Sequence, residues 1–398
     1  MKRVLLVLGL FVAVGAAIAF VHFRRELYRP YRGYSGHVIL VIAPGTTARD
    51  LAAILVERGV LARRLPFLLR YLMGRPRHRL KAGEYLFDRP LRPIDVYGKL
   101  IRGEIYLHPV LIPEGSDRFD IAATLQRDLQ INPDEFLRLT GEISLIRDLD
   151  PHAPTLEGYL FPDTYRFARG TSAATVVETM LGRFRHVYEA KFKQAGESSG
   201  ASLHDAMTLA SLVEKETPDP AERPIVAGVF ARRLILKMPL ACDPTVVYAA
   251  RLDHRMLEHP LPPITRSELN FDSPYNTYLH TGLPPGPIAS PGEASILAAF
   301  APAPGDALYF VSNNHGGHVF ARTLAEHERN VARYRRQVAE LRSQAERTTS
   351  AAGRPSNGKS SQGSHATGRQ KKRDQHENQK ATDSRTSPGA RAGAGGRK

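Results

Sequence analysis

The sequence predicts an α+β protein that begins with a transmembrane helix and ends in a disordered tail. A long apolar run stands at the N-terminus, short β-branched runs alternate with amphipathic helical patterns in the middle of the chain, and large apolar residues almost vanish near the end. The 398 residues are enough for two folded domains or more. The predicted parts are a transmembrane anchor at 1–25, a small β-α subdomain at 37–115, a mixed α/β domain at 116–345 and a disordered basic tail at 346–398.

The apolar run from Val4 to Phe23 lies between two pairs of basic residues and is long enough to cross a bilayer as a helix. The sequence Ala17-Ile18-Ala19 also fits the cleavage site of a secretory signal peptide, but apolar residues continue past it and favour an uncleaved anchor. Either alternative places most of the chain outside the cytoplasm. The positive-inside rule favours the opposite orientation, because more arginines follow the run than precede it.

The net charge of +15 is concentrated in the tail, since residues 354–398 alone carry +8. The remaining +7 forms no basic stripe in the sequence, so no nucleic-acid partner is predicted. The tail is rich in Gly, Ser, Ala, Gln and Arg and lacks the apolar residues needed for a core, which predicts disorder. Contact with anionic polymers or lipids and a purely solvated tail are both consistent with it.

The residue content argues against several kinds of site. The single cysteine, Cys242, excludes an intrachain disulfide and a zinc site built on cysteines. The sequence has no P-loop, dinucleotide fingerprint, HExxH or GxSxG motif. Because His204, His315, His318 and His327 are scattered, neither a metal nor a cofactor is predicted.

Strand and helix patterns alternate between residues 37 and 115. Strands are predicted at 38–42, 83–87 and 105–112, and helices at 47–56, 64–73 and 93–101. Pro44-Gly45 predicts a turn, and Gly103 predicts the end of the last helix. A binding domain and a packing or spacer domain are both consistent with this pattern.

Helical patterns dominate the larger domain. Helices are predicted within 117–146 and at 171–194, 202–217 and 324–345, with an aromatic, turn-rich stretch at 157–165 and a hairpin at 308–320. Three segments rich in Pro, Gly, Tyr, Asn or Thr are predicted to form a rigid loop wall: 243–248, 273–278 and 282–288. Tyrosine rings and asparagine amides in such a wall suit sugar rings.

Glu214 lies near the end of the helix predicted at 202–217. Ser202, followed three residues later by Asp205, resembles a capping box that begins this helix. Helical spacing places one face along Leu203, Met207, Ala210, Glu214 and Thr217. A carboxyl beside apolar surface is harder to ionise, so the pKa of Glu214 is predicted to rise, and a protonated carboxyl near neutral pH is suited to general acid catalysis.

Two alternatives weigh against this prediction. A solvated glutamate at a helix end has the same spacing. In addition, Asp219-Pro220-Ala221-Glu222 resembles a second capping box with proline at the first helical position, so another helix is predicted to begin close to Glu214. The positive end of that helix dipole would favour the carboxylate and lower the pKa of Glu214. Spacing alone does not decide which effect dominates.

Seven ordered motifs resemble the YceG-like endolytic murein transglycosylases, the family usually called MltG. They are IPEG (112–115), LEGYLFPDTY (156–165), LASLVEKET (209–217), DPTVVY (243–248), SPYNTY (273–278), GLPPGPIASPG (282–292) and GGHVFARTLAEH (316–327). The resemblance covers roughly 38–342. It implies that the small β-α subdomain is LysM-like and that the mixed α/β domain is the YceG-like catalytic domain.

The resemblance implies a bacterial inner-membrane enzyme whose catalytic domain lies outside the cytoplasm. Such an enzyme cleaves the β-1,4 bond between N-acetylmuramic acid and N-acetylglucosamine in nascent peptidoglycan strands and leaves 1,6-anhydro ends. The family's catalytic acid and base corresponds to Glu214, and peptidoglycan synthases are possible partners. The resemblance also implies a set of substrate-binding residues: Tyr248, Tyr275, Asn276, Thr277, Tyr278, Asp243 and Thr245.

Several residues near Glu214 have expected supporting roles, and two positions differ from the family pattern. Glu216 is expected to orient or pair with other groups, Asp219 and Glu222 to cap a helix, and Asp243 to begin an Asx turn. Ala241 and Cys242 stand where the family commonly has Gln and then Ser or Thr, which puts subsite contacts in question. A muramidase-type hydrolase that uses water and a non-catalytic wall-binding scaffold for synthases are the alternatives.

Overall fold

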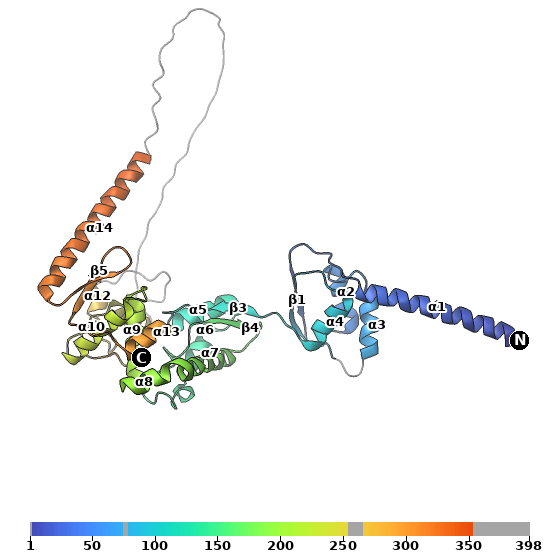
Figure 1. The fold of residues 1–398 in the computed structure, drawn as a ribbon, viewed down its shortest axis with the longest axis horizontal. Helices are drawn as coiled ribbons and strands as arrows, with labels where there is room; N and C mark the ends of the chain where they lie inside the picture. Colours follow the sequence, from blue (N-terminus) through green and yellow to red (C-terminus); the bar gives the residue numbers. More distant parts are fainter. Residues whose placement is uncertain (1, 75–78, 254–265, 353–398) are drawn as a thin grey trace, which may run out of the picture. The chain divides into compact units, whose positions relative to one another are not determined.

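The computed structural model describes residues 2–74, 79–253 and 266–352. The chain divides into two units, 1–341 and 342–398, and the elements below belong to the first apart from the end of the last helix. Helices and short strands are mixed along the chain, as the α+β prediction requires (Figure 1). Most of the predicted tail lies outside the described residues, and the last helix continues to Ala352, past its predicted end at Ala345.

The predicted anchor is a single helix, α1 (Lys2–Tyr28). It is long and apolar enough to cross a membrane, and none of its apolar window is buried within the protein. Its last turn differs, because the Leu27 side chain is buried and the Tyr28 ring stacks under the guanidinium of Arg92 at 5.7 Å. The end of α1 is therefore packed against the small domain at 37–115.

The segment after α1 has its own small core. Its elements are β1 (Val38–Ile42), α2 (Ala48–Glu57), α3 (Arg64–Gly74), β2 (Gly83–Phe87) and α4 (Pro93–Arg102). β1 and β2 pair antiparallel, with Leu40 opposite Tyr85. Their inward side chains pack on Leu51, Phe67 and Leu100, which are all fully buried. These five elements agree with the predicted ones, and Gly103 ends α4 in the left-handed conformation at φ 72°.

The third strand predicted for the small subdomain, at 105–112, pairs with a strand of the larger part instead. It is shortened to β3 (His108–Leu111) and pairs antiparallel with β4 (Thr164–Phe167), so that Val110 lies opposite Tyr165. Both of these residues are part of the larger core. A strand pattern in the sequence predicts the strand but not its partner, since pairing depends on residues more than fifty positions apart.

The larger part is mostly helical. Its remaining elements are α5 (Arg118–Leu129), α6 (Pro133–Leu139), η1 (Ile143–Leu145), α7 (Ala173–Val187), η2 (Tyr188–Phe192), α8 (Lys193–Ser199), α9 (Leu203–Glu216), α10 (Arg223–Ile235), α11 (Asp243–Leu252), α12 (Arg266–Leu269), α13 (Glu293–Phe300), β5 (Tyr309–Ser312), β6 (His318–Ala321) and α14 (Leu324–Ala352). The predicted helix at 171–194 is interrupted by the π-helical turn η2. β5 and β6 form the predicted hairpin.

Helix α9 lies at the centre of the larger core. Ser202 caps it by accepting a hydrogen bond from the backbone N–H of Asp205, as predicted. Every residue from Ala206 to Val213 is buried, because α10, α11 and α13 all pack on α9. The prediction of one apolar face is too narrow, since the small residues Ala206, Ala210 and Ser211 allow close packing on several sides.

Two predicted segments fold differently. The helix predicted from Asp219 begins at Arg223, and Glu222 precedes it without making a side-chain cap, so the second capping box is wrong. Asp219 instead accepts a hydrogen bond from Ala221 N–H in a tight turn. Residues 243–248, predicted as loop, begin α11, where Pro244 occupies a first-turn position that needs no backbone donor. The Asx turn predicted at Asp243 is replaced by this helix.

Replacing Gly158 by any other residue is expected to destabilise the fold. Its φ is 85°, and a Cβ would lie 2.5 Å from the Cβ of Pro287. Gly158→Ala is therefore expected to lower the free energy of unfolding by about 2 to 4 kcal/mol, through left-handed strain and overpacking together. Thermal unfolding checks this. Gly182→Ala in α7, where nothing lies within 4 Å, is the control and should be neutral or stabilising.

Candidate active site

Glu214 occupies the last turn of α9, and both of its carboxylate oxygens have partners. Oε1 accepts a hydrogen bond from Nη2 of Arg223 at 2.9 Å, and Oε2 accepts one from the backbone N–H of Gly292 at 2.9 Å. The side chains of Glu214 and Arg223 are 6% and 7% exposed, so this ion pair is shielded from solvent. Both carboxylate oxygens therefore act as hydrogen-bond acceptors, one for a side chain and one for the backbone.

Two loops lie against Glu214. The backbone N–H of Gly115 donates to the carbonyl of Ser290 at 2.9 Å, and the N–H of Ser290 donates to the carbonyl of Ser116 at 2.8 Å. The loop around Gly115 therefore pairs with the loop before Gly292, and both are held beside the glutamate. These loops contain two of the motifs in which the sequence resembles the YceG-like family, IPEG and GLPPGPIASPG.

A second carboxyl stands beside the first. Glu114 lies 3.6 Å from Nη2 of Arg223, the same guanidinium nitrogen that binds Glu214. Its side chain is 51% exposed, in contrast to the buried Glu214. A Cβ on Gly292 would lie 2.1 Å from the carboxyl carbon of Glu114, so glycine at 292 allows this close approach.

Sequence reasoning missed Glu114, Arg223 and Gly292 as partners of Glu214. Arg223 sits nine residues beyond Glu214, across a turn whose shape the mistaken capping box obscured. Glu114 and Gly292 come from segments far away in the chain. The sequence could have indicated these two residues only through the family motifs, because Glu114 lies in IPEG and Gly292 lies in GLPPGPIASPG.

Lys215 connects Glu214 to a small cavity. Its ammonium donates to the carbonyl of Gly115 at 3.1 Å. The cavity, of about 190 Å³, has acidic, basic and aromatic groups in its wall. It is lined by Asp117, Lys215, Asp243, Pro244, Val247, Tyr248, Arg251 and Ile288. Lys215, the residue after Glu214, is part of this wall, whereas Glu214 itself does not line the cavity.

The predicted tyrosines occupy different depths. Tyr248 and Tyr275 are 3% and 8% exposed, and their ring centroids lie 5.1 Å apart. The hydroxyl of Tyr248 donates to Oε2 of Glu157 at 3.1 Å. Tyr278 is 38% exposed, and its hydroxyl donates to Oδ1 of Asp243 at 2.5 Å. The structure thus brings Tyr248 and Asp243 to the cavity wall.

The other predicted substrate contacts lie in the interior. Asn276 is fully buried, and its amide donates to the carbonyls of Leu269 and Phe271. Thr277 and Thr245 are also buried, with their hydroxyl oxygens 2.9 Å apart. The two threonines join the loop at 273–278 to the start of α11, and Asn276 joins it to the end of α12.

Glu216 and Glu222 make contacts of their own. Burial raises the pKa of Glu216, and a contact with Cys242 opposes that rise. Glu222 accepts hydrogen bonds from Thr217 at 3.1 Å and from the backbone N–H of His318 at 2.7 Å. Glu222 therefore ties the turn after α9 to the hairpin. Cys242 is buried and precedes α11 without capping it through its side chain.

Two buried acidic groups lie at the cavity: Asp117 is part of its wall, and Glu157 binds Tyr248 in that wall. Burial and the charge of Asp117 raise the pKa of Glu157 to about 8. Burial and the neighbouring Asp120 raise the pKa of Asp117 to about 6, although Arg251 opposes this by pairing with it. Glu157 accepts hydrogen bonds on Oε2 from Tyr248 and from the backbone N–H of Arg118. These groups position Tyr248 and the start of α5.

Glu157→Gln is expected to change the pH dependence of stability. The folded state holds a proton on Glu157 up to about pH 8, and an unfolded glutamate loses it near pH 4.5. The free energy of unfolding is therefore highest below pH 4.5, as far as Glu157 determines it, and it falls as the pH rises toward about 8. The variant should remove a loss on the order of 3 kcal/mol between these limits. Denaturant unfolding at both ends of the range measures it, with the exposed Glu178→Gln as a control.

Metal ligands do not gather at this site. Within residues 2–74, 79–253 and 266–352, no three side chains of His, Cys, Asp or Glu come together as a metal site requires. His318 contacts Glu222 through Nδ1 at 2.7 Å, and His204 contacts Asp150 at 2.8 Å. The chemistry available at Glu214 is therefore that of a carboxylate with a guanidinium, a backbone N–H and a second carboxyl around it.

Comparison with known proteins gives consistent matches. A family model described as the YceG-like family matches residues 40–333. The chain is 32% identical over 305 residues to the endolytic murein transglycosylase of Bacillus subtilis (strain 168), a match that covers 72% of this chain and 82% of that protein. The endolytic murein transglycosylase of Streptococcus pneumoniae serotype 2 (strain D39) is 29% identical over 323 residues, covering 74% and 58% respectively.

A solved structure agrees with these matches. The 2.6 Å crystal structure of a yceG-like protein of Listeria monocytogenes superposes with a TM-score of 0.51 at 30% identity. The match covers 74% of this chain and 99% of that one. The matched region of the family model includes Glu114, Glu214, Arg223 and Gly292.

Proposed function

Because the chain belongs to the YceG-like family, we propose that it is an endolytic murein transglycosylase that uses Glu214 as its catalytic acid and base. The observation that carries this proposal is the setting of Glu214. It is a shielded carboxyl held from both sides by Arg223 and Gly292, and the next residue, Lys215, lines a cavity with polar and aromatic walls. The substrate is a peptidoglycan strand, cut at the β-1,4 bond between N-acetylmuramic acid and N-acetylglucosamine.

Proton donation is the first step. A glycan that covers the small exposed part of Glu214 removes the remaining solvent from around the carboxyl. Protonated Glu214 gives its proton to the leaving glycosidic oxygen as positive charge develops on the sugar ring. Arg223 and the N–H of Gly292 then stabilise the carboxylate that forms.

Proton removal is the second step. The carboxylate of Glu214 takes the proton from the 6-hydroxyl of the muramic acid residue, whose oxygen attacks the anomeric carbon. The bond to the leaving sugar is replaced by an internal bond, so a 1,6-anhydro end forms without water. Glu214 is protonated again and ready for another cycle. One carboxyl serves both steps because they occur in sequence.

The cavity beside Lys215 is the proposed glycan subsite. Tyr248 offers an aromatic edge, Asp243 a hydrogen-bond acceptor, and Lys215 a cation for the carboxylates that peptidoglycan stems carry. Tyr275 and Tyr278 extend this wall. Asn276, Thr277 and Thr245 act from beneath by fixing the loop that carries these tyrosines.

The N-terminal parts are proposed to place the enzyme at the membrane. The helix α1 is the anchor in the inner membrane, with the rest of the chain outside the cytoplasm. The small core formed by β1 to α4 is the LysM-like subdomain. Peptidoglycan synthases are the proposed protein partners, because strand cleavage at the membrane acts on their product.

Glu114 favours a second candidate, a muramidase-type hydrolase. Such an enzyme needs a second carboxylate to activate water, and Glu114 is an exposed carboxyl that shares Arg223 with Glu214. The two functions differ in their products, since hydrolysis leaves reducing ends.

Digestion of purified glycan strands by the full chain tests the two functions. The transglycosylase is expected to give anhydro ends by mass, and Glu114→Gln should keep those ends with a loss of rate below about tenfold, because no water needs activation. The hydrolase requires reducing ends in the wild type and a loss of about 10²-fold or more in Glu114→Gln. Reducing ends as the main product would reject the proposed transglycosylase.

A further inference from the structure

Helix α3 presents apolar side chains to solvent as well as to the core. Phe67 is fully buried, whereas Leu65, Leu72 and Met73 are 64%, 59% and 65% exposed. Leu65, Leu69 and Leu72 follow helical spacing and therefore share one face. This face and the loop before α2 enclose a hollow of about 750 Å³. An exposed apolar face of this kind indicates a contact surface.

The charge around this face has one sign. Residues 60–81 contain seven Lys or Arg and no Asp or Glu. Arg63 and Arg64, at the start of α3, are exposed, and so is Arg49 in the wall of the hollow. A partner for this surface must therefore combine negative charge with apolar groups.

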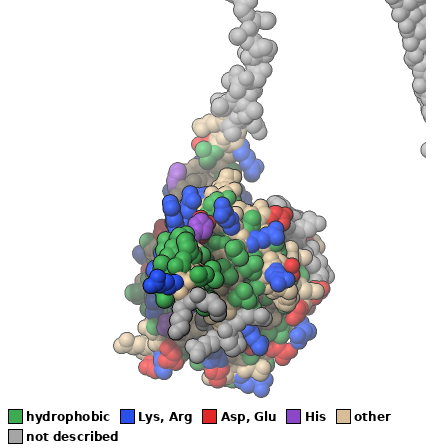
Figure 2. Space-filling view, turned by 90° about the vertical axis from the view of Figure 1, so that its right-hand side faces the viewer, with side chains coloured by type: hydrophobic (Ala, Val, Ile, Leu, Met, Phe, Trp, Pro, Cys, Tyr) green, Lys and Arg blue, Asp and Glu red, His purple; other side chains and the backbone are tan. Residues whose placement is uncertain are grey.

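The start of α3 lies at the end of the candidate membrane span. A cavity of about 190 Å³ is lined by Glu26 from the last turn of α1, by Arg29 just after that helix, and by Arg63 and Pro66. The span becomes polar at Arg24, so residues next to its end lie at the depth of lipid headgroups. Figure 2 shows the side of the molecule from which α1 projects, where hydrophobic side chains gather with Lys and Arg side chains beside them.

We propose that the exposed face of α3 docks on the anionic phospholipid leaflet into which α1 inserts. Leu65, Leu72 and Met73 enter the boundary between headgroups and acyl chains, and the arginines bind phosphates. A lipid surface suits this face better than a glycan does, because aliphatic side chains predominate and sugar rings prefer aromatic faces. Docking would hold the LysM-like subdomain flat on the membrane rather than free at the end of α1.

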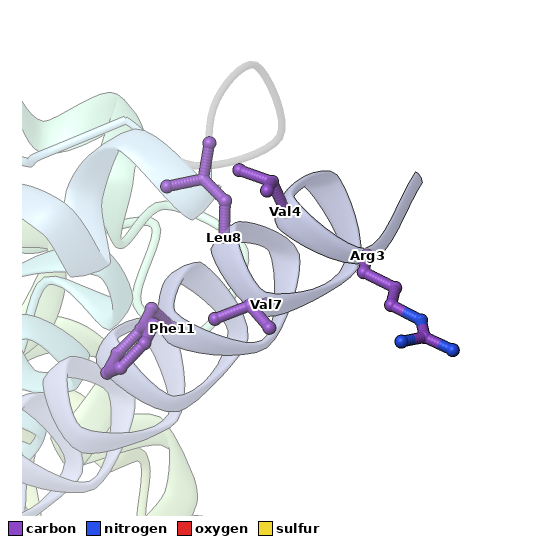
Figure 3. A pocket seen from close by; sticks show the side chains of 5 residues that line it. All are labelled: Arg3, Val4, Val7, Leu8 and Phe11. Atoms are coloured by element: carbon purple, nitrogen blue, oxygen red, sulfur yellow. The ribbon is translucent and has the colours of Figure 1, made fainter. Parts of the chain in front are cut away.

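The absence of tryptophan from the sequence makes a direct test available. A single tryptophan in the full chain reports depth through quenching by brominated lipids in vesicles of phosphatidylcholine and phosphatidylglycerol. Leu72→Trp is expected to lose roughly half of its emission, as an interfacial residue should. Ile235→Trp, at an exposed site on α10, should not be quenched. Phe11→Trp, whose side chain projects from α1 (Figure 3), should be quenched strongly.

Arginine variants and vesicles of different lipid composition test whether anionic lipid causes the quenching. Arg63→Gln combined with Arg64→Gln should reduce quenching of Leu72→Trp, as should vesicles without phosphatidylglycerol. Equal quenching of Leu72→Trp and Ile235→Trp, or no dependence on anionic lipid, overturns the proposal. So does a spectral change of Leu72→Trp with glycan strands but not with brominated lipid. The inference rests on the proposed anchor, and an unquenched Phe11→Trp would show that the anchor itself fails. Glycan cleavage by these variants reports separately on the catalytic proposal.

Discussion

Glu214→Gln is expected to lower the rate of glycan cleavage by about 10³-fold. Glutamine keeps the size of the side chain and an oxygen that can accept from the N–H of Gly292. It cannot donate a proton to the glycosidic oxygen or take one from the 6-hydroxyl, so both proposed steps fail. The rate of appearance of new strand ends measures the effect.

Glu178→Gln is the matched control for this loss. It makes the same chemical change on an exposed face of α7 and should leave the rate unchanged. Thermal unfolding of both variants verifies that the fold is kept. If Glu214→Gln cleaved strands at a rate within tenfold of the wild type, the assignment of Glu214 would be wrong.

Arg223→Met is expected to have the second large effect, on stability as well as on activity. The guanidinium is 7% exposed and neutralises the buried carboxylate of Glu214 at 2.9 Å. Removing it leaves a shielded negative charge without a cation, which costs about 3 kcal/mol in the free energy of unfolding. Activity should fall too, because the carboxylate formed after proton donation loses its main stabilising contact.

A double variant separates these effects. In Glu214→Gln with Arg223→Met the buried charge is gone, so the double variant should be more stable than Arg223→Met alone. Denaturant unfolding of the wild type, both single variants and the double variant provides the cycle. Additive losses of stability would contradict a direct ion pair between the two side chains.

Local features of the sequence were sufficient to predict much of the fold. The cap at Ser202, the helix that carries Glu214, the first β-α elements and the final hairpin are all determined by residues close together in the chain. The family resemblance drawn from the ordered motifs is confirmed by the match over 40–333. These features place Glu214 at the end of a buried helix.

The surroundings of Glu214 could not be predicted in the same way. Its contact with Gly292 joins residues 78 positions apart, and the pairing of Gly115 with Ser290 spans a longer separation still. Spacing along one helix does not encode such contacts. The start of the next helix was also mispredicted, because Glu222 binds His318 instead of capping, and this error concealed Arg223.

The depth of the loop wall is another tertiary property. Asn276 and Tyr278 are two residues apart in one motif, yet the first is fully buried and the second is 38% exposed. Composition predicted a sugar-binding wall from both residues without separating them. The tertiary contacts distinguish them, because the Asn276 amide donates to the carbonyls of Leu269 and Phe271, whereas the Tyr278 hydroxyl binds Asp243.

The fate of water tests the proposed chemistry most directly. Glycan strands are digested by the full chain in water enriched in the heavy isotope of oxygen, and the new ends are reduced at once and analysed by mass. Cleavage through Glu214 and the 6-hydroxyl predicts anhydro ends that contain no heavy oxygen, with formation lost in Glu214→Gln. Heavy oxygen in most of the new muramic acid ends would show that water attacks the anomeric carbon and would contradict the transglycosylase mechanism.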